Sequence, residues 1–210
     1  MEIQKQLSEY WSIYTPEQAD AVAAYFPNAE IEEGSVRAVL INEVVPERPE
    51  DNFYSKAGMP AYLQTAIPLF CAAGAQVQDA YDLLQGGIYL TNAIRLPKKS
   101  SAIPKEDILR DLPLLEAELS LFPNLEVIIL MGDVAKKAFN MIAKKNTGRN
   151  AVPAISTYQL RQTEIRYRGI RVIPSYIMTG ANLLIEKSKP ALISADIAAM
   201  LQSIGWEAEA

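Results

Sequence analysis

Histidine and cysteine, two of the side chains most used in acid–base and metal chemistry, are nearly absent from this chain. Its 210 residues include no histidine and a single cysteine, Cys71. These counts exclude Ser-His-Asp and Cys-His catalysis, histidine-ligated metals, an internal disulfide and a four-cysteine metal or iron–sulfur cage. Imidazole is also absent as an acid, a base or an oxyanion donor. We therefore expect no bound metal and no cofactor.

Other polar residues follow apolar runs and could do chemistry there. Glu43 comes just past one run, and a carboxylate in that position can stabilise a cation or orient an attacking water. Asn92 ends another run, and its amide offers a donor and an acceptor together. Structural alternatives stay open for both, because Glu43 could be a solvated loop carboxylate or a helix cap. Asn92 could equally cap a strand end or a turn.

The elements that must position these residues alternate along the chain. Short apolar runs predict strands over 36–42, 88–92 and 127–131, and an alternating segment over 164–173 predicts a hairpin into a fourth strand. Helical patterns fall over 16–25, 60–73, 78–84, 104–122, 133–144 and 190–205. This order predicts an α/β fold with a parallel sheet covered by helices on both faces. Ligands of such sheets bind outside the carboxyl ends of the strands.

Length and composition predict one domain over residues 1–210, with residues 1–30 as an N-terminal helical segment. Apolar runs such as Val127–Met131 are too short to cross a bilayer, and the first residues lack the apolar region of a signal peptide. We therefore expect a cytoplasmic monomer without membrane contact. Glu116, Glu118 and Glu126 are expected on the surface.

Four segments together resemble the uracil-DNA glycosylase superfamily, most closely its iron–sulfur branch. The resemblance lies at the strand ends and covers roughly residues 34–203. The segments are Leu40–Asp51, Tyr89–Pro97, Ile129–Phe139 and Tyr167–Tyr176. The resemblance implies a three-layer α/β/α sandwich around a four-stranded parallel sheet. It also implies hydrolysis of the bond that joins uracil, or a related deaminated base, to DNA.

The resemblance assigns roles to individual residues. Glu43 matches the glutamate of the first family motif and Asn42 precedes it, so both are catalytic candidates. Asn92 matches the asparagine that reads the uracil edge. Further candidates for holding the base are Phe53, Tyr54, Tyr62 and Thr179. Candidates for binding DNA phosphate are Lys98, Lys99 and Gly180, although a pair of lysines is also typical of a solvated face.

The chain departs from the family pattern in three ways. The cluster cysteines are missing, Ile177 replaces the motif histidine, and Ala61 stands where the family has a phenylalanine that stacks on uracil. The net charge of −5 is also unlike that of a dedicated duplex binder, although a local basic face can suffice. Uracil-containing or damaged DNA is the expected partner. A module that binds a base, a nucleotide or damaged DNA without cleavage is the alternative.

Overall fold

The computed structural model describes residues 1–56, 58–100, 102–180, 183 and 188–206. Within them lies a five-stranded sheet with the strand order β2-β1-β3-β5-β4. The strands are β1 (Ala38–Val44), β2 (Ile88–Ile94), β3 (Val127–Met131), β4 (Ile165–Tyr167) and β5 (Ile170–Ser175). The first three pairings in this order are parallel, and only β4 runs antiparallel to its neighbour. The predicted parallel sheet is confirmed, with a short hairpin strand added at one edge.

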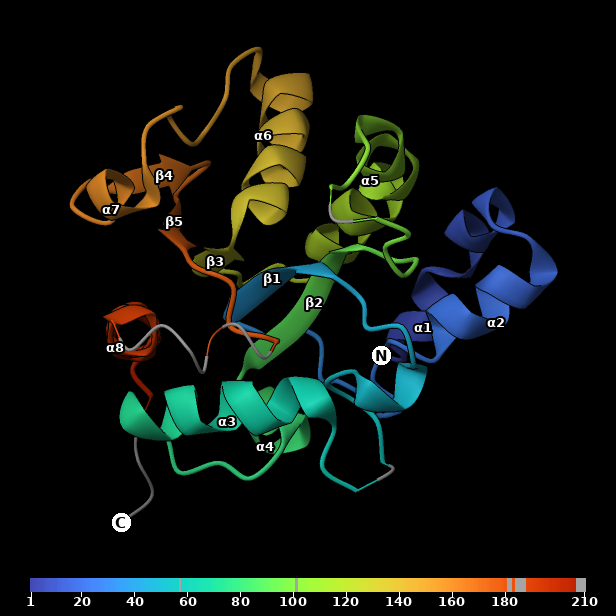
Figure 1. Cartoon of the computed structure of the whole chain (residues 1–210), viewed down its shortest axis with the longest axis horizontal. Helices are drawn as coiled ribbons and strands as arrows, with labels where there is room; N and C mark the ends of the chain where they lie inside the picture. Colours follow the sequence, from blue (N-terminus) through green and yellow to red (C-terminus); the bar gives the residue numbers. More distant parts are fainter. Residues whose placement is uncertain (57, 101, 181–182, 184–187, 207–210) are drawn as a thin grey trace.

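Helices cover both faces of the sheet, so the fold is a three-layer α/β/α sandwich (Figure 1). One layer contains α3 (Ala61–Ala72), α4 (Ala80–Gln85) and α8 (Ser188–Ser203). The opposite layer contains α5 (Lys105–Ser120) and α6 (Asp133–Thr147). Contacts of α8 with β3 and β5, and of α6 with β1 and β3, hold the two layers on the sheet. The α/β class predicted from the alternating pattern is therefore confirmed.

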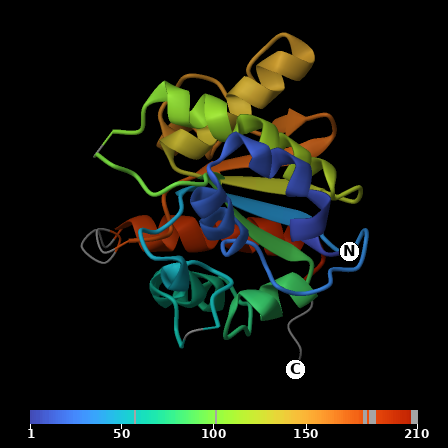
Figure 2. The same cartoon turned by 90° about the vertical axis from the view of Figure 1, so that its right-hand side faces the viewer.

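The N-terminal segment packs beside α5 (Figure 2). It comprises α1 (Ile3–Gln6), the 3₁₀ helix η1 (Ser8–Ile13) and α2 (Pro16–Ala23). Thr15 and Gln18 form the capping box that starts α2, as their spacing predicts. The Tyr14 hydroxyl donates to Asp111 of α5 at 2.9 Å, which ties this segment to the helix layer.

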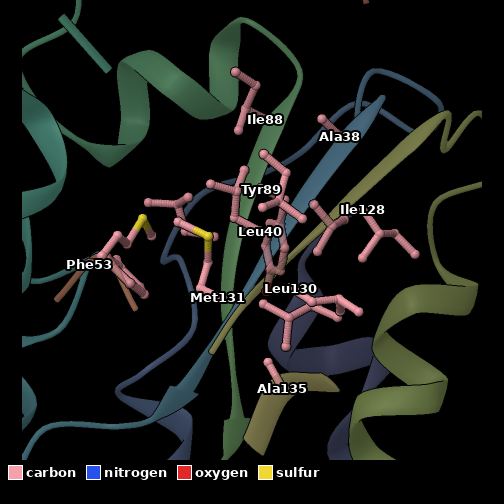
Figure 3. Close-up of a cluster of buried hydrophobic side chains, with 14 of the residues drawn as sticks. Ala38, Leu40, Phe53, Ile88, Tyr89, Ile128, Leu130, Met131 and Ala135 are labelled. Atoms are coloured by element: carbon pink, nitrogen blue, oxygen red, sulfur yellow. The ribbon is translucent and has the colours of Figure 1, made fainter. Parts of the chain in front are cut away.

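The core lies on both faces of the central strands, because neither face of a parallel sheet is left to solvent. Ile128 and Leu130 point to the side of Ala135 of α6, whereas Met131 points toward Phe53 (Figure 3). All five side chains are at most 1% exposed. Burying each of the larger aliphatic ones stabilises the fold by roughly 1.5–3 kcal/mol.

Several boundaries differ from the sequence prediction. Strands β1 and β2 each run two residues further than expected, so Glu43 lies inside a strand rather than in a loop. The short helices η2 (Pro49–Asp51) and α7 (Thr157–Leu160) lie in stretches for which the sequence predicts no helix. Such short turns carry no apolar periodicity that would predict them. Among the described residues, no helix is both long enough and apolar enough to cross a membrane.

Candidate functional site at the carboxyl ends of the strands

Two asparagines face each other at the carboxyl ends of β1 and β2. Asn42 and Asn92 are register partners in the parallel ladder, so their side chains share a face of the sheet. Asn42 Nδ2 donates to Asn92 Oδ1 at 3.1 Å. From the segment after β5, Thr179 Oγ1 donates to Asn42 Oδ1 at 3.3 Å. The structure thus brings together three residues that the sequence assigned to one site.

The hydrogen-bonded series continues into the loop after β1. Asn92 Nδ2 donates to Asn52 Oδ1 at 3.1 Å, and Asn52 Nδ2 donates to the carbonyl of Tyr25 at 3.0 Å. Asn42, Asn92 and Asn52, which we call the amide series, are each 1% exposed. A buried amide needs such partners, and together they fix its orientation. Sequence analysis missed Asn52, since a lone asparagine in a proline-containing loop gives no signal of burial.

Glu43 points to the other face of the sheet, because successive strand residues alternate. Its Oε1 accepts the backbone N–H of Val134, in the first turn of α6, at 2.9 Å. A carboxylate is stabilised at this end of a helix by the unpaired amides and by the helix dipole. One oxygen of Glu43 therefore caps α6, which is the helix-cap role that the sequence left open.

Burial raises the pKa of the Glu43 carboxyl above its ordinary value of 4.5. The charge of Asp133 acts in the same direction, whereas the backbone amides of Val134 and Asp133 and the charge of Lys98 lower the pKa. The segment after β5 connects Glu43 with the amide series across the end of the sheet. Its Ile177 lies beside Gly132 and Glu43, and its Thr179 reaches Asn42. We call Glu43, the amide series and Thr179 the strand-end site.

The three aromatic candidates separate into two places. Tyr62 borders the strand-end site, where its hydroxyl donates to the carbonyl of Val44 at 2.8 Å and lies near the Thr179 hydroxyl. Phe53 packs against Tyr62 with ring centroids 5.4 Å apart. Tyr54 lies elsewhere: its hydroxyl accepts the N–H of Leu90 at 2.9 Å, closing the outer edge of β2. Burial raises the pKa of the Tyr62 hydroxyl, which keeps it protonated.

The candidates for binding phosphate lie at the rim. Lys98 and Lys99 are exposed, and Lys98 is close enough to act on the charge of Glu43. Gly180 is exposed with φ of 98°, a backbone conformation that favours glycine. Within the described part of the chain, no group of three or more His, Cys, Asp or Glu side chains could hold a metal ion.

Gly132 allows the close approach of Glu43 to α6. Its φ is 101°, and a Cβ there would lie 2.4 Å from Glu43 Oε1 and 2.6 Å from Ile177 Cγ1. We expect Gly132→Ala to lower the free energy of unfolding by about 1–3 kcal/mol more than Gly148→Ala does, because overpacking adds to backbone strain. Gly148 is the matched control, since its φ is 77° and nothing lies within 4 Å of its added Cβ. Equal losses in urea denaturation would show that Glu43 and Ile177 do not crowd Gly132.

The raised pKa of Glu43 also predicts a dependence of stability on pH. The folded protein favours the protonated carboxyl, so this contribution to stability is complete below pH 4.5 and is lost as pH rises through the raised folded pKa. Urea denaturation at about pH 4 and about pH 7 should therefore show that Glu43→Gln gains stability relative to the wild type at the higher pH. A difference between the two proteins that does not change with pH would contradict the shift.

The fold and the strand-end site define this protein as a three-layer α/β/α sandwich with a polar, largely buried site at the carboxyl edge of a parallel sheet. No protein-family model and no curated protein matches the sequence. A mutant of UNG from Nitratifractor salsuginis matches with a TM-score of 0.44 at 12% identity, covering 94% of this chain and 92% of the other. The wild-type UNG structure gives 0.42 at 14% identity, covering 94% and 91%. Similarities of this size assign no activity to the chain.

Proposed function

We propose that the strand-end site binds uracil or a related deaminated base in DNA and that the protein hydrolyses the N-glycosidic bond of that base. The observation that carries the proposal is the convergence of Thr179, Asn42 and Asn92 in one hydrogen-bonded series. Glu43 adds a partly desolvated carboxylate at the same edge of the sheet. The sequence resemblance assigns base reading to Asn92 and catalysis to Glu43.

Asn92 is the proposed reader of the base. A carboxamide has two N–H donors and two acceptor lone pairs on its oxygen. Asn92 uses one donor toward Asn52 and one lone pair toward Asn42. One donor and one acceptor remain, the combination that the edge of a pyrimidine such as uracil requires. Tyr62, whose ring packs against the buried ring of Phe53, is the aromatic residue that borders the strand-end site.

Glu43 is the proposed catalytic carboxylate. The backbone amides of Val134 and Asp133 hold its carboxylate, whose charge would orient a water or stabilise the positive charge that develops on the sugar. Asn42, adjacent in the strand, positions the hydroxyl of Thr179. The carboxylate must be ionised for either role, so its raised pKa moves the onset of activity to higher pH.

The leaving base has few donors to stabilise its charge. Ile177 offers no hydrogen bond, so backbone amides and the Thr179 hydroxyl are the groups proposed for this task. Loss of one such donor typically lowers a rate by about 10²–10³-fold. We therefore expect a slow enzyme, in which Lys98, Lys99 and Gly180 contact DNA phosphate.

A binding module without bond cleavage is the second candidate. The observation that favours it is the position of Ile177, which packs against Gly132 beside Glu43 where a side-chain donor would be useful. In this case the amide series would recognise the base and Glu43 would serve only as the cap of α6.

Single- and double-stranded oligonucleotides with one uracil, incubated with excess protein, distinguish the two candidates. The enzyme proposal expects free uracil and an abasic site to form slowly, with less product as salt concentration rises. Saturable binding that depends on uracil, without base release, would support the module instead. If the protein neither releases uracil nor binds DNA in a uracil-dependent way, both candidates are refuted.

A further inference from the structure

A cavity of about 810 Å³ lies along β5 and contains none of the strand-end residues. Its floor includes Val172 and Ile173 of β5, which are buried, and one wall is formed by α8. The opposite wall is residues 160–166, the end of α7 and the start of β4. Sites for small molecules typically measure about 300–1,000 Å³ and combine apolar walls with a few polar groups. The volume of this cavity lies in that range, and its exposed lining is more polar than apolar.

The acidic side chains of the lining are neutralised by arginines. Arg161 joins the two walls, because it extends from the end of α7 to Asp196 of α8. Each ion pair joins an arginine Nε to a carboxylate oxygen: Arg161 and Asp196 at 2.8 Å, Arg166 and Glu164 at 2.8 Å, and Arg37 and Glu126 at 2.6 Å. Arg171 is the remaining charged residue of the lining, and no carboxylate within the described ranges pairs with it.

Arg171 is held in place but not saturated. Its Nη1 donates to Ser203 Oγ at 2.7 Å and to the carbonyl of Ala199 at 3.4 Å, both on α8. A guanidinium has five N–H donors. In Arg171, the donors on Nε and Nη2 have no partner in the described part of the chain. These donors lie in one plane, which suits two parallel hydrogen bonds to a carboxylate or phosphate.

We propose that this cavity is a second binding site, which takes a small organic anion. The carboxylate or phosphate of the ligand binds Arg171, and its aliphatic part covers Ile173, which shares the α8 face of β5 with Arg171. Among the described residues of the lining, none has an aromatic ring on which a planar base could stack. Because the other charged residues of the lining are paired, Arg171 leaves one net positive charge. A ligand with a single anionic group matches it.

Three six-carbon probes with different head groups test the proposal. Hexanoate, hexyl phosphate and hexanol are titrated separately into the full-length protein by calorimetry. We expect the two anions to bind at millimolar concentration or below and hexanol to bind at least about tenfold more weakly, because it cannot form a charge-assisted pair. Tighter binding of hexyl phosphate would point to a phosphate ligand, and tighter binding of hexanoate to a carboxylate.

Variants locate the binding. Arg171→Met should weaken the anions at least about tenfold, whereas Arg48→Met, which removes an exposed cation paired with Asp51 outside the cavity lining, should change binding by less than about threefold. Arg171→Lys keeps the charge and should retain part of the affinity. Equal binding of hexanol and the anions to the wild type, or no binding of either anion, would overturn the proposal. Undiminished binding to folded Arg171→Met would also overturn it, and the comparison in the wild type remains decisive if that variant does not fold.

Discussion

Replacing Glu43 with glutamine is expected to lower the rate of uracil release by about 10²–10⁴-fold, the usual contribution of a positioned acid or base. Glutamine retains an oxygen that can accept the Val134 N–H, so the cap of α6 is preserved. What is lost is the negative charge of the carboxylate, which its two oxygens share. The measurement is single-turnover release of uracil from a single-stranded oligonucleotide.

Glu47→Gln is the matched control for that experiment. Glu47 is an exposed carboxylate four residues further along, so this variant makes the same change of charge outside the strand-end site. We expect it to release uracil at the wild-type rate. If Glu43→Gln releases uracil as fast as the wild type and Glu47→Gln do, Glu43 is a structural cap and the catalytic assignment is wrong.

Replacing Glu118 with alanine is expected to lower the free energy of unfolding by about 3–5 kcal/mol, because one partner of a buried ion pair is removed. Glu118 is 0% exposed and pairs with Arg95, which is 1% exposed. The hydroxyls of Tyr89 and Thr91 also donate to Glu118, at 2.7 and 2.9 Å. The variant would therefore leave a buried guanidinium without its counter-charge.

Urea denaturation of Glu118→Ala and Glu116→Ala tests this prediction. Glu116 lies on the same helix but is partly exposed, with Lys145 as its partner at 2.7 Å. Exposed pairs contribute little, so Glu116→Ala should cost less than about 1 kcal/mol. Similar losses in the two variants would show that burial does not strengthen the dependence on Glu118.

The Glu118 network also supports the strand-end site. Thr91 and Arg95 flank Asn92 along β2, and both are bound to Glu118. The backbone N–H of Arg95 also donates to Asp111 of α5 at 2.7 Å. The end of β2 is therefore fixed on the helix layer on either side of the residue proposed to read the base.

The parallel sheet could be predicted from sequence because buried strands and amphipathic helices have distinct periods. The convergence of Asn42 and Asn92 follows from the same topology, since parallel strands bring their carboxyl ends to one edge. Their direct contact could not be predicted, because it depends on a register that the sequence does not state. Strand ends are equally hard to place, as Glu43 shows by lying inside β1.

The expected surface position of Glu118 was wrong for a different reason. Asp111, Leu115 and Glu118 lie at helical spacing on the buried face of α5. A charged residue on an apolar stripe is normally assigned to the surface, because burying an unpaired charge is costly. The partner that permits burial, Arg95, is distant along the chain, so only the tertiary structure reveals it.

Titration of free uracil into isotope-labelled protein, followed by two-dimensional NMR, tests most directly whether the strand ends form a base site. The account predicts saturable shifts of the side-chain amide signals of Asn42 and Asn92 and of the backbone signal of Thr179, with the signal of Arg171 unchanged. Thymine, which carries an added methyl group, serves as the competitor that reports selectivity. Uracil that leaves the two asparagine amides unperturbed, or that shifts signals only elsewhere in the protein, would contradict the account.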